Sequence, residues 1–349
     1  MGGTRRVRWT EVARRLAQVI PKERLHPGVL AWAAGRTRSA RERWAVACSG
    51  GADSVALLLL IWAHWPERAQ GLLVLHFDHA LRGAASRGDE RFCRKFATAL
   101  GCDYHSTRWA GARAQVSEAT LREARLQFFD AAMKRSGSRA LWLGHQADDV
   151  AETLLMRIAR GSGAAGLAAP RPVQRLSSGS VRVRPLLALG RDELRAELKS
   201  AGGGWRDDES NKTGRFFRNR IRSDLLPIWR GAVSDRDALT GACLSRELLE
   251  EDDEALRVWL EEIGPLRRRG VLDLKLMEDK PRALWRRAIH GWLLSSGYRG
   301  DLSKRGFDLL LEAAMRGVPT RQSMGRESFA VIAGNQLRYV NNLRRRAQK

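Results

Sequence analysis

Short apolar runs alternate with longer helical patterns along the middle of the chain. The runs that have the length of buried strands are 44–48, 71–76 and 141–143. Patterns typical of helices follow them at 55–63, 89–100 and 147–160. A further helix is expected after Ser117, because Leu121, Ala124, Phe128 and Ala132 fall on one face of it. Strands that alternate with helices at this spacing predict an α/β fold with a parallel sheet and helices on both of its faces.

The two ends of the chain have a different pattern. We expect an N-terminal helical extension over 1–40, a catalytic domain over 41–229, and a C-terminal region over 230–349. The C-terminal region is mostly helical in pattern and ends in a small α+β part. There, Gly334 and Asn335 separate two apolar runs, 329–333 and 336–340, which predicts a β-hairpin.

The turn after the first predicted strand carries the most specific chemistry. It reads Ser49-Gly50-Gly51-Ala52-Asp53-Ser54 and leads into the buried helix. Adjacent glycines allow the backbone N–H groups to approach an anion, and the helix start adds a positive dipole. A carboxylate beside a phosphate group is favourable only with a cation such as Mg²⁺, which gives Asp53 a role. The alternative is an ordinary glycine-rich turn.

Composition narrows the class of partner. The formal net charge is +23, from 62 basic and 39 acidic residues, which fits a polyanion such as nucleic acid. An arginine-rich proteome would give the same excess, so charge alone decides nothing. The four cysteines form no C-x-x-C pair, and the apolar run 55–63 is too short to span a membrane. We therefore expect a cytoplasmic protein with no membrane partner.

Two acidic residues open the helix at 147–160. Asp149 and Glu152 are three residues apart and face the same way. Such a pair is suited to chelating Mg²⁺ or to holding the ammonium group of an amino acid. The alternative is that both simply complement the helix dipole. Their position after a buried strand, at the ligand-binding edge of the sheet, favours function.

Arginines recur at helical spacing in two further segments. Arg122 and Arg125 share a face and are suited to clamping phosphate, although a surface ion pair with Glu118 is the alternative. Arg215, Arg218 and Arg222 form a stripe suited to RNA backbone or ATP phosphates. A solvated helix face remains the alternative, more for Arg215 and Arg222 than for Arg218.

The pattern SGGxDS of residues 49–54 resembles the PP-loop pyrophosphatases, which split ATP into AMP and pyrophosphate. Further segments, in this order, resemble the tRNA(Ile)-lysidine synthase family from about Arg43 to Trp229. They are His76-Phe77-Asp78-His79-Ala80-Leu81-Arg82, His145-Gln146-Ala147-Asp148-Asp149, Arg184-Pro185-Leu186-Leu187, Asp207-Asp208-Glu209-Ser210-Asn211 and Arg218-Asn219-Arg220-Ile221-Arg222. The stretch from Leu302 to Val340 is similar to that family's small tRNA-binding domain.

The resemblance implies a reaction and a set of roles. The wobble cytidine of the CAU-anticodon isoleucine tRNA would be adenylated by ATP, and free L-lysine would then displace AMP from C2 to give lysidine. The implied cofactors are ATP and Mg²⁺. The implied residues are Asp53, Asp149, Glu152, Arg125 and Arg218 in catalysis, Ser49, Gly50, Gly51, Ala52, Asp53 and Ser54 at the nucleotide, Arg122, Asp208 and Asn211 at the substrate, and Asp53 and Asp149 at the metal.

Two other functions stay open from the sequence. A PP-loop tRNA thiolase also adenylates a base, but that chemistry usually needs a cysteine pair or a cluster. A non-catalytic RNA-binding protein on a decayed PP-loop fold is the other, against which the intact Asp53, Asp149 and Glu152 argue. The sequence leaves the oligomeric state open, including a homodimer.

Overall fold

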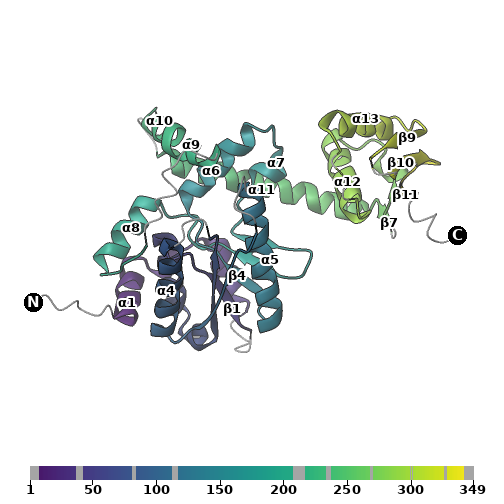
Figure 1. Cartoon of the computed structure of the whole chain (residues 1–349). Coiled ribbons are helices and arrows are strands. Elements are labelled where there is room, and N and C mark those ends of the chain that lie inside the picture. The colour runs from purple at the N-terminus through teal and green to yellow at the C-terminus, as the bar shows by residue number, and fades with distance from the viewer. Residues whose placement is uncertain are drawn as a thin grey trace, which may run out of the picture. The chain divides into compact units, whose positions relative to one another are not determined.

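The computed structural model describes most of the chain as ordered elements (Figure 1). The residues it describes are 8–36, 42–80, 84–111, 117–206, 217–232, 237–267, 270–298, 300, 302–325 and 328–341. They fall into two compact units, Met1–Glu250 and Glu251–Lys349. The domain boundaries expected at 40 and 229 stay predictions.

The first unit is built on a mostly parallel sheet with the order β3-β2-β1-β4-β6-β5. The strands are β1 (Trp44–Ala47), β2 (Leu72–Asp78), β3 (Asp103–Arg108), β4 (Ala140–Trp142), β5 (Val173–Arg175) and β6 (Val181–Val183). All neighbouring strands are parallel except β5, which runs antiparallel to β6. Trp44 of β1 is paired with Leu72 on one side and Ala140 on the other, so these strands start level. Their carboxyl ends therefore share one edge.

Helices cover both faces of this sheet, which confirms the expected fold class. Those of the first unit are α1 (Trp9–Val19), α2 (Pro27–Ala34), α3 (Ala52–His64), α4 (Ala84–Ala99), α5 (Glu118–Ser136), α6 (Ala147–Ile158), α7 (Ala164–Leu167), α8 (Arg191–Ser200), α9 (Phe217–Arg220), a π-helical turn (Ile221–Leu225) and α10 (Leu226–Ala232). The helix α11 (Ala238–Ile263) contributes residues to both units.

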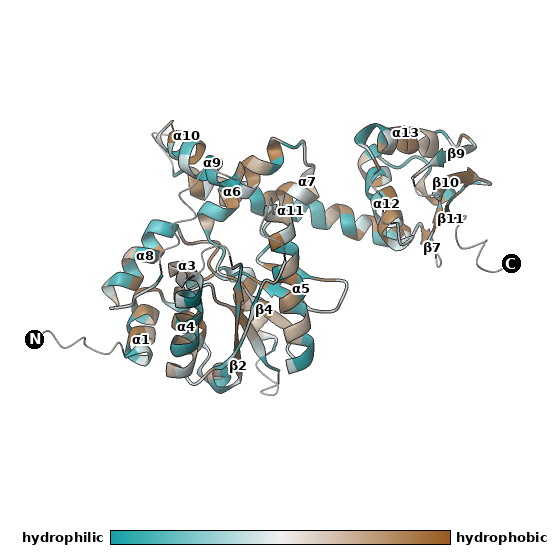
Figure 2. Ribbon diagram, viewed as in Figure 1, coloured by the Kyte–Doolittle hydropathy of each residue, from teal (hydrophilic) through white to brown (hydrophobic). Residues whose placement is uncertain are grey.

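The alternation of side chains along each strand decides which helices meet which face. Trp44 and Val46 belong to a core with α1, α2, α3, α4 and α8, whereas Ala45 belongs to a core with α5. In α3 every residue from Val55 to Ile61 is buried, which explains why this helix is apolar on all sides. Figure 2 shows the same division, with brown strands between helices whose outer faces are teal.

The sheet region differs from the expectation in several places, and strands β5 and β6 are among the elements that were not predicted. The helix α4 begins at Ala84, five residues before the predicted start at Asp89, because the stretch before Asp89 is polar and small rather than apolar. Strand β3 was not predicted, since its residues are half-buried or exposed and carry no apolar run. It lies at the edge of the sheet, where burial on both faces is not required.

The second unit contains an antiparallel sheet with the order β7-β8-β11-β10-β9. Its elements are β7 (Leu266–Arg267), β8 (Val271–Asp273), α12 (Arg282–Ser295), α13 (Lys304–Met315), β9 (Thr320–Ser323), β10 (Ser328–Ala333) and β11 (Gln336–Asn341). The predicted hairpin is confirmed: Gly334 and Asn335 both have φ of 56° between paired β10 and β11. Leu310 and Trp292 are buried in its core.

Candidate active site at the carboxyl edge of the sheet

Hydrogen bonds to the hydroxyl group of Ser54 hold the turn after β1 in shape. The backbone N–H groups of Ser49 and Gly50 each donate to Ser54 Oγ at 3.2 Å, and Ser54 Oγ donates to Gly51 O at 2.9 Å. Gly50 has a φ of +90°, and a Cβ there would lie 3.2 Å from Cys93 Sγ. Only glycine takes this conformation without strain, so the turn is specified locally by its sequence.

The start of α3 is open to an anion. Gly51 is its N-cap residue and provides no side-chain cap. The first N–H groups of a helix have no partner within the helix, and the helix dipole adds positive charge at the same place. A phosphate group at this position would accept from these N–H groups.

The loop after β4 packs directly against this turn. A Cβ on Gly144 would lie 3.0 Å from the backbone oxygen of Asp53, which is closer than side chains normally come. Glycine at position 144 therefore allows two segments about ninety residues apart in sequence to meet. This contact joins the ends of β1 and β4, where the order of strands changes direction and ligands of α/β proteins bind.

A cleft of about 270 Å³ opens at this edge of the sheet. Its walls come from the ends of β1, β2 and β4 and from α4 and α5. Among the residues that line it are Ser49, Asp53, Ser54, His76, His79, Arg125 and His145. Its position and its mixture of polar and apolar walls suit a nucleotide.

Asp53 lines the cleft with a largely buried carboxylate. Its Oδ1 is buried and has no hydrogen-bond partner in the described part of the chain. Burial, together with the negative charge of Asp149, raises the pKa of Asp53 to about 6, although Arg191, Arg195 and Arg222 oppose the shift. A cation between Asp53 and Asp149 would relieve both causes. The donor set therefore fits Mg²⁺, which proteins hold through one or two carboxylates together with substrate phosphates.

Asp149 has a structural partner of its own. Gln146 is the N-cap of α6, and its side chain accepts from Asp148 N at 2.7 Å. In return Asp149 Oδ2 accepts from Gln146 N at 3.0 Å, which makes a capping box. The remaining oxygen, Oδ1, accepts from Arg218 Nη2 at 2.5 Å. One carboxylate thus both fixes the start of α6 and faces the site.

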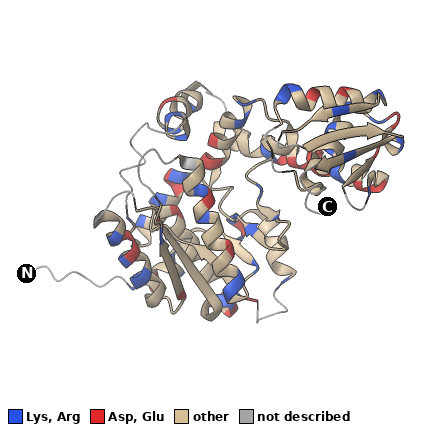
Figure 3. Ribbon diagram, turned by 45° about the vertical axis from the view of Figure 1, so that its right-hand side comes forward, with Lys and Arg blue, Asp and Glu red and all other residues tan. Residues whose placement is uncertain are grey.

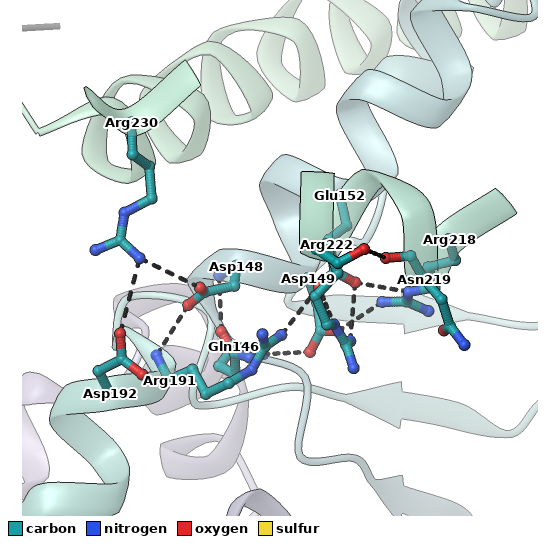
Figure 4. A network of polar contacts seen from close by, with 11 residues as sticks. Gln146, Asp148, Asp149, Glu152, Arg191, Asp192, Arg218, Asn219, Arg222 and Arg230 are labelled. Carbon is teal, nitrogen blue, oxygen red and sulfur yellow. Dashed lines mark hydrogen bonds and ion pairs between the residues drawn. The ribbon is translucent and has the colours of Figure 1, made fainter. Parts of the chain in front are cut away.

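Glu152 lies one turn further along α6 and is completely buried, with 0% of its side chain exposed. Three arginines surround it (Figure 4). Its Oε1 accepts from Arg191 Nη2 at 2.9 Å and from Arg222 Nε at 2.6 Å. Its Oε2 accepts from Arg218 Nε at 2.7 Å and from Arg222 Nη2 at 3.0 Å. Four charge-assisted hydrogen bonds occupy both oxygens, which leaves this carboxylate to the arginines rather than to a metal ion.

The two acidic residues of α6 therefore have different surroundings. Both carboxylates form ion pairs with Arg218, which is consistent with their shared helix face. The charge of Asp149 also acts on Asp53, whereas Glu152 links α6 to Arg191 of α8 and to the arginines after residue 217. For Arg222, the alternative to a binding role was a position on a solvent-exposed helix face. The structure instead places its side chain half-buried against Glu152. No group of three or more His, Cys, Asp and Glu side chains able to hold a metal ion occurs among the described residues.

Arginines also gather around the loop after β4. Arg184 is buried, with 4% exposed, and its Nε donates to His145 Nδ1 at 3.2 Å. Burial, then the charges of Arg184, Arg218, Arg125 and Arg122, holds the pKa of His145 well below its ordinary value. Arg125 lines the cleft itself, and Arg122 is exposed on the same helix. This end of the cleft is positively charged and suits the phosphates of a nucleotide.

This arrangement has counterparts in known proteins. A sequence profile of the PP-loop domain matches residues 10–229, which is more than half of the chain. The chain belongs to the PP-loop family. The match covers the sheet, the turn at 49–54 and the arginine network around Glu152.

Curated relatives of this PP-loop protein share a name. The tRNA(Ile)-lysidine synthase of Geobacter sulfurreducens is 39% identical over 280 residues, which cover 76% of this chain and 57% of the relative. Those of Rhodopirellula baltica and Bradyrhizobium diazoefficiens are 38% and 41% identical, over 56% and 52% of this chain and 55% and 50% of each relative. The chain thus spans about half the length of the curated relatives it matches.

Some expected residues of the PP-loop protein lie outside the described part. Asp208 and Asn211, expected at the substrate, belong to the stretch 207–216, as does Arg215. The segment leading to them is described, and Arg206 N donates to Gly50 O at 2.8 Å. Arg206 Nε also donates to the buried Asp89 at 2.9 Å, so this segment is held against the PP-loop turn.

Sequence reasoning missed two residues of the network. Arg191 begins α8 and reaches Glu152, and its backbone N–H donates to Asp148 Oδ2 at 2.9 Å. A single arginine after Gly190 gave no pattern that could have revealed this contact. Arg184 was quoted as part of a motif, but nothing in the sequence indicated its contact with His145. Figure 3 shows why charge alone is uninformative: basic and acidic residues share the same helices of the first unit.

Across the described residues there is no helix long and apolar enough to cross a membrane.

Proposed function

We propose that this PP-loop protein uses ATP to attach free L-lysine to C2 of the wobble cytidine in the CAU-anticodon isoleucine tRNA, which yields lysidine. The observation that carries the proposal is the Asp53 carboxylate, whose buried Oδ1 has no hydrogen-bond partner among the described residues, beside the open start of α3 and an arginine-rich wall. The name shared by the relatives supports lysine and this tRNA as the substrates. The basic balance of the chain, with a net charge of +23, fits a tRNA partner.

In the first step the C2 carbonyl oxygen of the cytidine attacks the α-phosphate of ATP, and pyrophosphate leaves. The first N–H groups of α3 and the hydroxyl of Ser49 would bind the departing phosphates, while the Ser54 hydroxyl holds the turn in shape. Arg125 in the cleft wall, with Arg122 beside it, would offset the negative charge that develops. Mg²⁺ held by Asp53 and Asp149 would neutralise phosphate charge when it is bound.

In the second step the lysine amine attacks C2, and AMP leaves. The amine must attack in its neutral form, so a carboxylate has to accept a proton. Asp149 is the better placed of the two α6 acids, because each of its oxygens accepts one of these hydrogen bonds whereas each oxygen of Glu152 accepts two from arginines. Arg218 contacts both acids and would orient the Asp149 carboxylate. Asp208 and Asn211 stay proposed substrate residues through the family resemblance.

Incubation with ATP, labelled lysine and tRNA transcripts tests this proposal. Label should enter the CAU-anticodon isoleucine tRNA and no transcript with another anticodon. Asp53→Asn should abolish incorporation because it removes charge at unchanged size, whereas the matched control Glu11→Gln, on the exposed face of α1, should keep it. Transfer of sulfur in place of lysine would establish a thiolase instead. Binding of tRNA without consumption of ATP would establish a non-catalytic protein.

A further inference from the structure

We propose that Arg184 is a positioning residue that holds His145 as a neutral imidazole, whose Nε2–H donates to a phosphate oxygen of the bound nucleotide. The proposal rests on the proposed function for the identity of that nucleotide. It assigns a hydrogen-bond donor to the reaction and excludes His145 as the base.

The hydrogen bond between the two side chains fixes the protonation of the ring. Arg184 Nε is always a donor, because a guanidinium group keeps its protons in proteins. At 3.2 Å from it, His145 Nδ1 must therefore present its lone pair. An imidazole with a bare Nδ1 is neutral and carries its proton on Nε2. The same bond thus selects both the charge and the tautomer.

Arg184 is itself held rigidly. Its Nη1 donates to Arg171 O at 2.6 Å and its Nη2 to Gln174 Oε1 at 3.1 Å. With 4% of its surface exposed, the guanidinium has little room to turn away from His145. The residue follows β6, which pairs with β4, so the sheet itself brings Arg184 beside the loop that carries His145.

The surroundings of His145 oppose a positive charge. The charged groups that face it are Arg184 after β6, Arg218 on α9, and Arg125 and Arg122 on α5. Burial and these four charges keep its pKa well below the ordinary value. The ring therefore stays neutral at physiological pH, and Nε2–H is the polar group left to it for a ligand of the cleft that His145 lines.

A phosphate oxygen is the acceptor that fits this donor. His145 directly follows Gly144, where even a Cβ would lie only 3.0 Å from the backbone oxygen of Asp53 in the PP-loop turn. The ring thus borders the part of the cleft where phosphates meet the start of α3. It cannot take a proton from the lysine amine, because its only lone pair accepts from Arg184. A carboxylate has to fill that role.

Nuclear magnetic resonance of the histidine rings tests the state of His145 without any activity. The protein has seven histidines, and comparison with His145→Gln assigns the signal. We expect a bare Nδ1 and a protonated Nε2 that do not change between about pH 5.5 and 8. In Arg184→Leu the proton should be shared between Nδ1 and Nε2, because the donor that fixes the tautomer is lost while the burial and the other three arginines remain. Titration of His145 in the unaltered protein, or a proton on Nδ1, would overturn the proposal.

Kinetics test the role of the donor. His145→Gln places an N–H near the Nε2 position and should keep most of the rate, whereas His145→Phe should lose about 10- to 100-fold in kcat. Arg184→Leu should cost little more once His145→Phe is present, because both remove one function. The exposed His105→Gln is the matched control and should leave the rate unchanged.

The outcomes separate this inference from the proposed function. Equal losses for His145→Gln and His145→Phe, or fully additive effects of Arg184→Leu and His145→Phe, would show that no donor function is involved. If Arg184→Leu does not fold, the ring state in the unaltered protein still decides. Ligation of lysine with a titrating His145 would refute the inference alone, and a fixed ring without lysine ligation would refute the proposed function alone.

Discussion

Glu152 should be the residue on which the local structure of the active site depends most. Glu152→Gln keeps the size of the side chain but removes the charge that faces Arg191, Arg218 and Arg222. The amide offers one oxygen, and its NH₂ group would point at a guanidinium. Removing one partner of a buried ion pair costs about 3–5 kcal/mol of stability, because the remaining charges stay buried without compensation.

Glu152→Gln should also weaken the local structure of the segment that contacts residue 152. Residues 217–232 are tied to α6 through Arg218 and Arg222, so their amide hydrogens should exchange faster in Glu152→Gln than in the unaltered protein. Urea unfolding at pH 7 should show a loss of about 3 kcal/mol in the first unit. The matched control is Glu11→Gln, which removes an exposed ion pair with Arg8 and should change stability by less than about 1 kcal/mol.

The direction of the pKa shift of Glu152 predicts how its contribution to stability changes with pH. Burial acts to raise the pKa of Glu152, but the hydrogen bond from Arg222 and the charge of Arg218 outweigh it, so the pKa lies below its ordinary value. The stabilisation is therefore complete above about pH 4.5 and is lost as the pH falls through the lowered pKa. A loss under 1 kcal/mol at pH 7, with unchanged exchange of 217–232, would refute the anchoring role.

Three further predictions concern the PP-loop cleft. Because folding raises the pKa of Asp53 to about 6, its charge destabilises the apo protein above that pH, so Asp53→Asn should raise the free energy of unfolding at pH 8 by up to about 3 kcal/mol. This gain in stability should shrink below pH 6 and vanish below about pH 4. If Asp53→Asn gave no gain at pH 8, burial would not raise the pKa of Asp53. Gly144→Ala places a Cβ 3.0 Å from Asp53 O and should abolish ATP consumption. The control Gly204→Ala should not, because no atom lies within 4 Å of a Cβ at that position. Removal of Mg²⁺ with a chelator should stop ATP consumption and be reversed by added Mg²⁺; full activity in the chelator would refute the metal role of Asp53 and Asp149.

The residues of the PP-loop turn were predictable because their constraints are local. Gly50 needs a positive φ, and the hydroxyl of Ser54 bonds within its own turn, so neighbours in sequence are also neighbours in space. The hairpin at Gly334 was predictable for the same reason. The strand β3 was not, since an edge strand with half-exposed residues leaves no apolar pattern.

The sequence by itself determined the alternation of β1, β2 and β4 with the helices that follow them, the turn at 49–54, and the common face of Asp149 and Glu152. Only the tertiary structure decided which side chains these acids contact. Arg218 and Arg222 lie 66 and 70 residues from Glu152 in the chain, and Arg184 lies 39 from His145. No periodicity links residues so far apart. Their partners are set when the sheet and helices pack, because only then do the buried acids and the arginines come within hydrogen-bond distance.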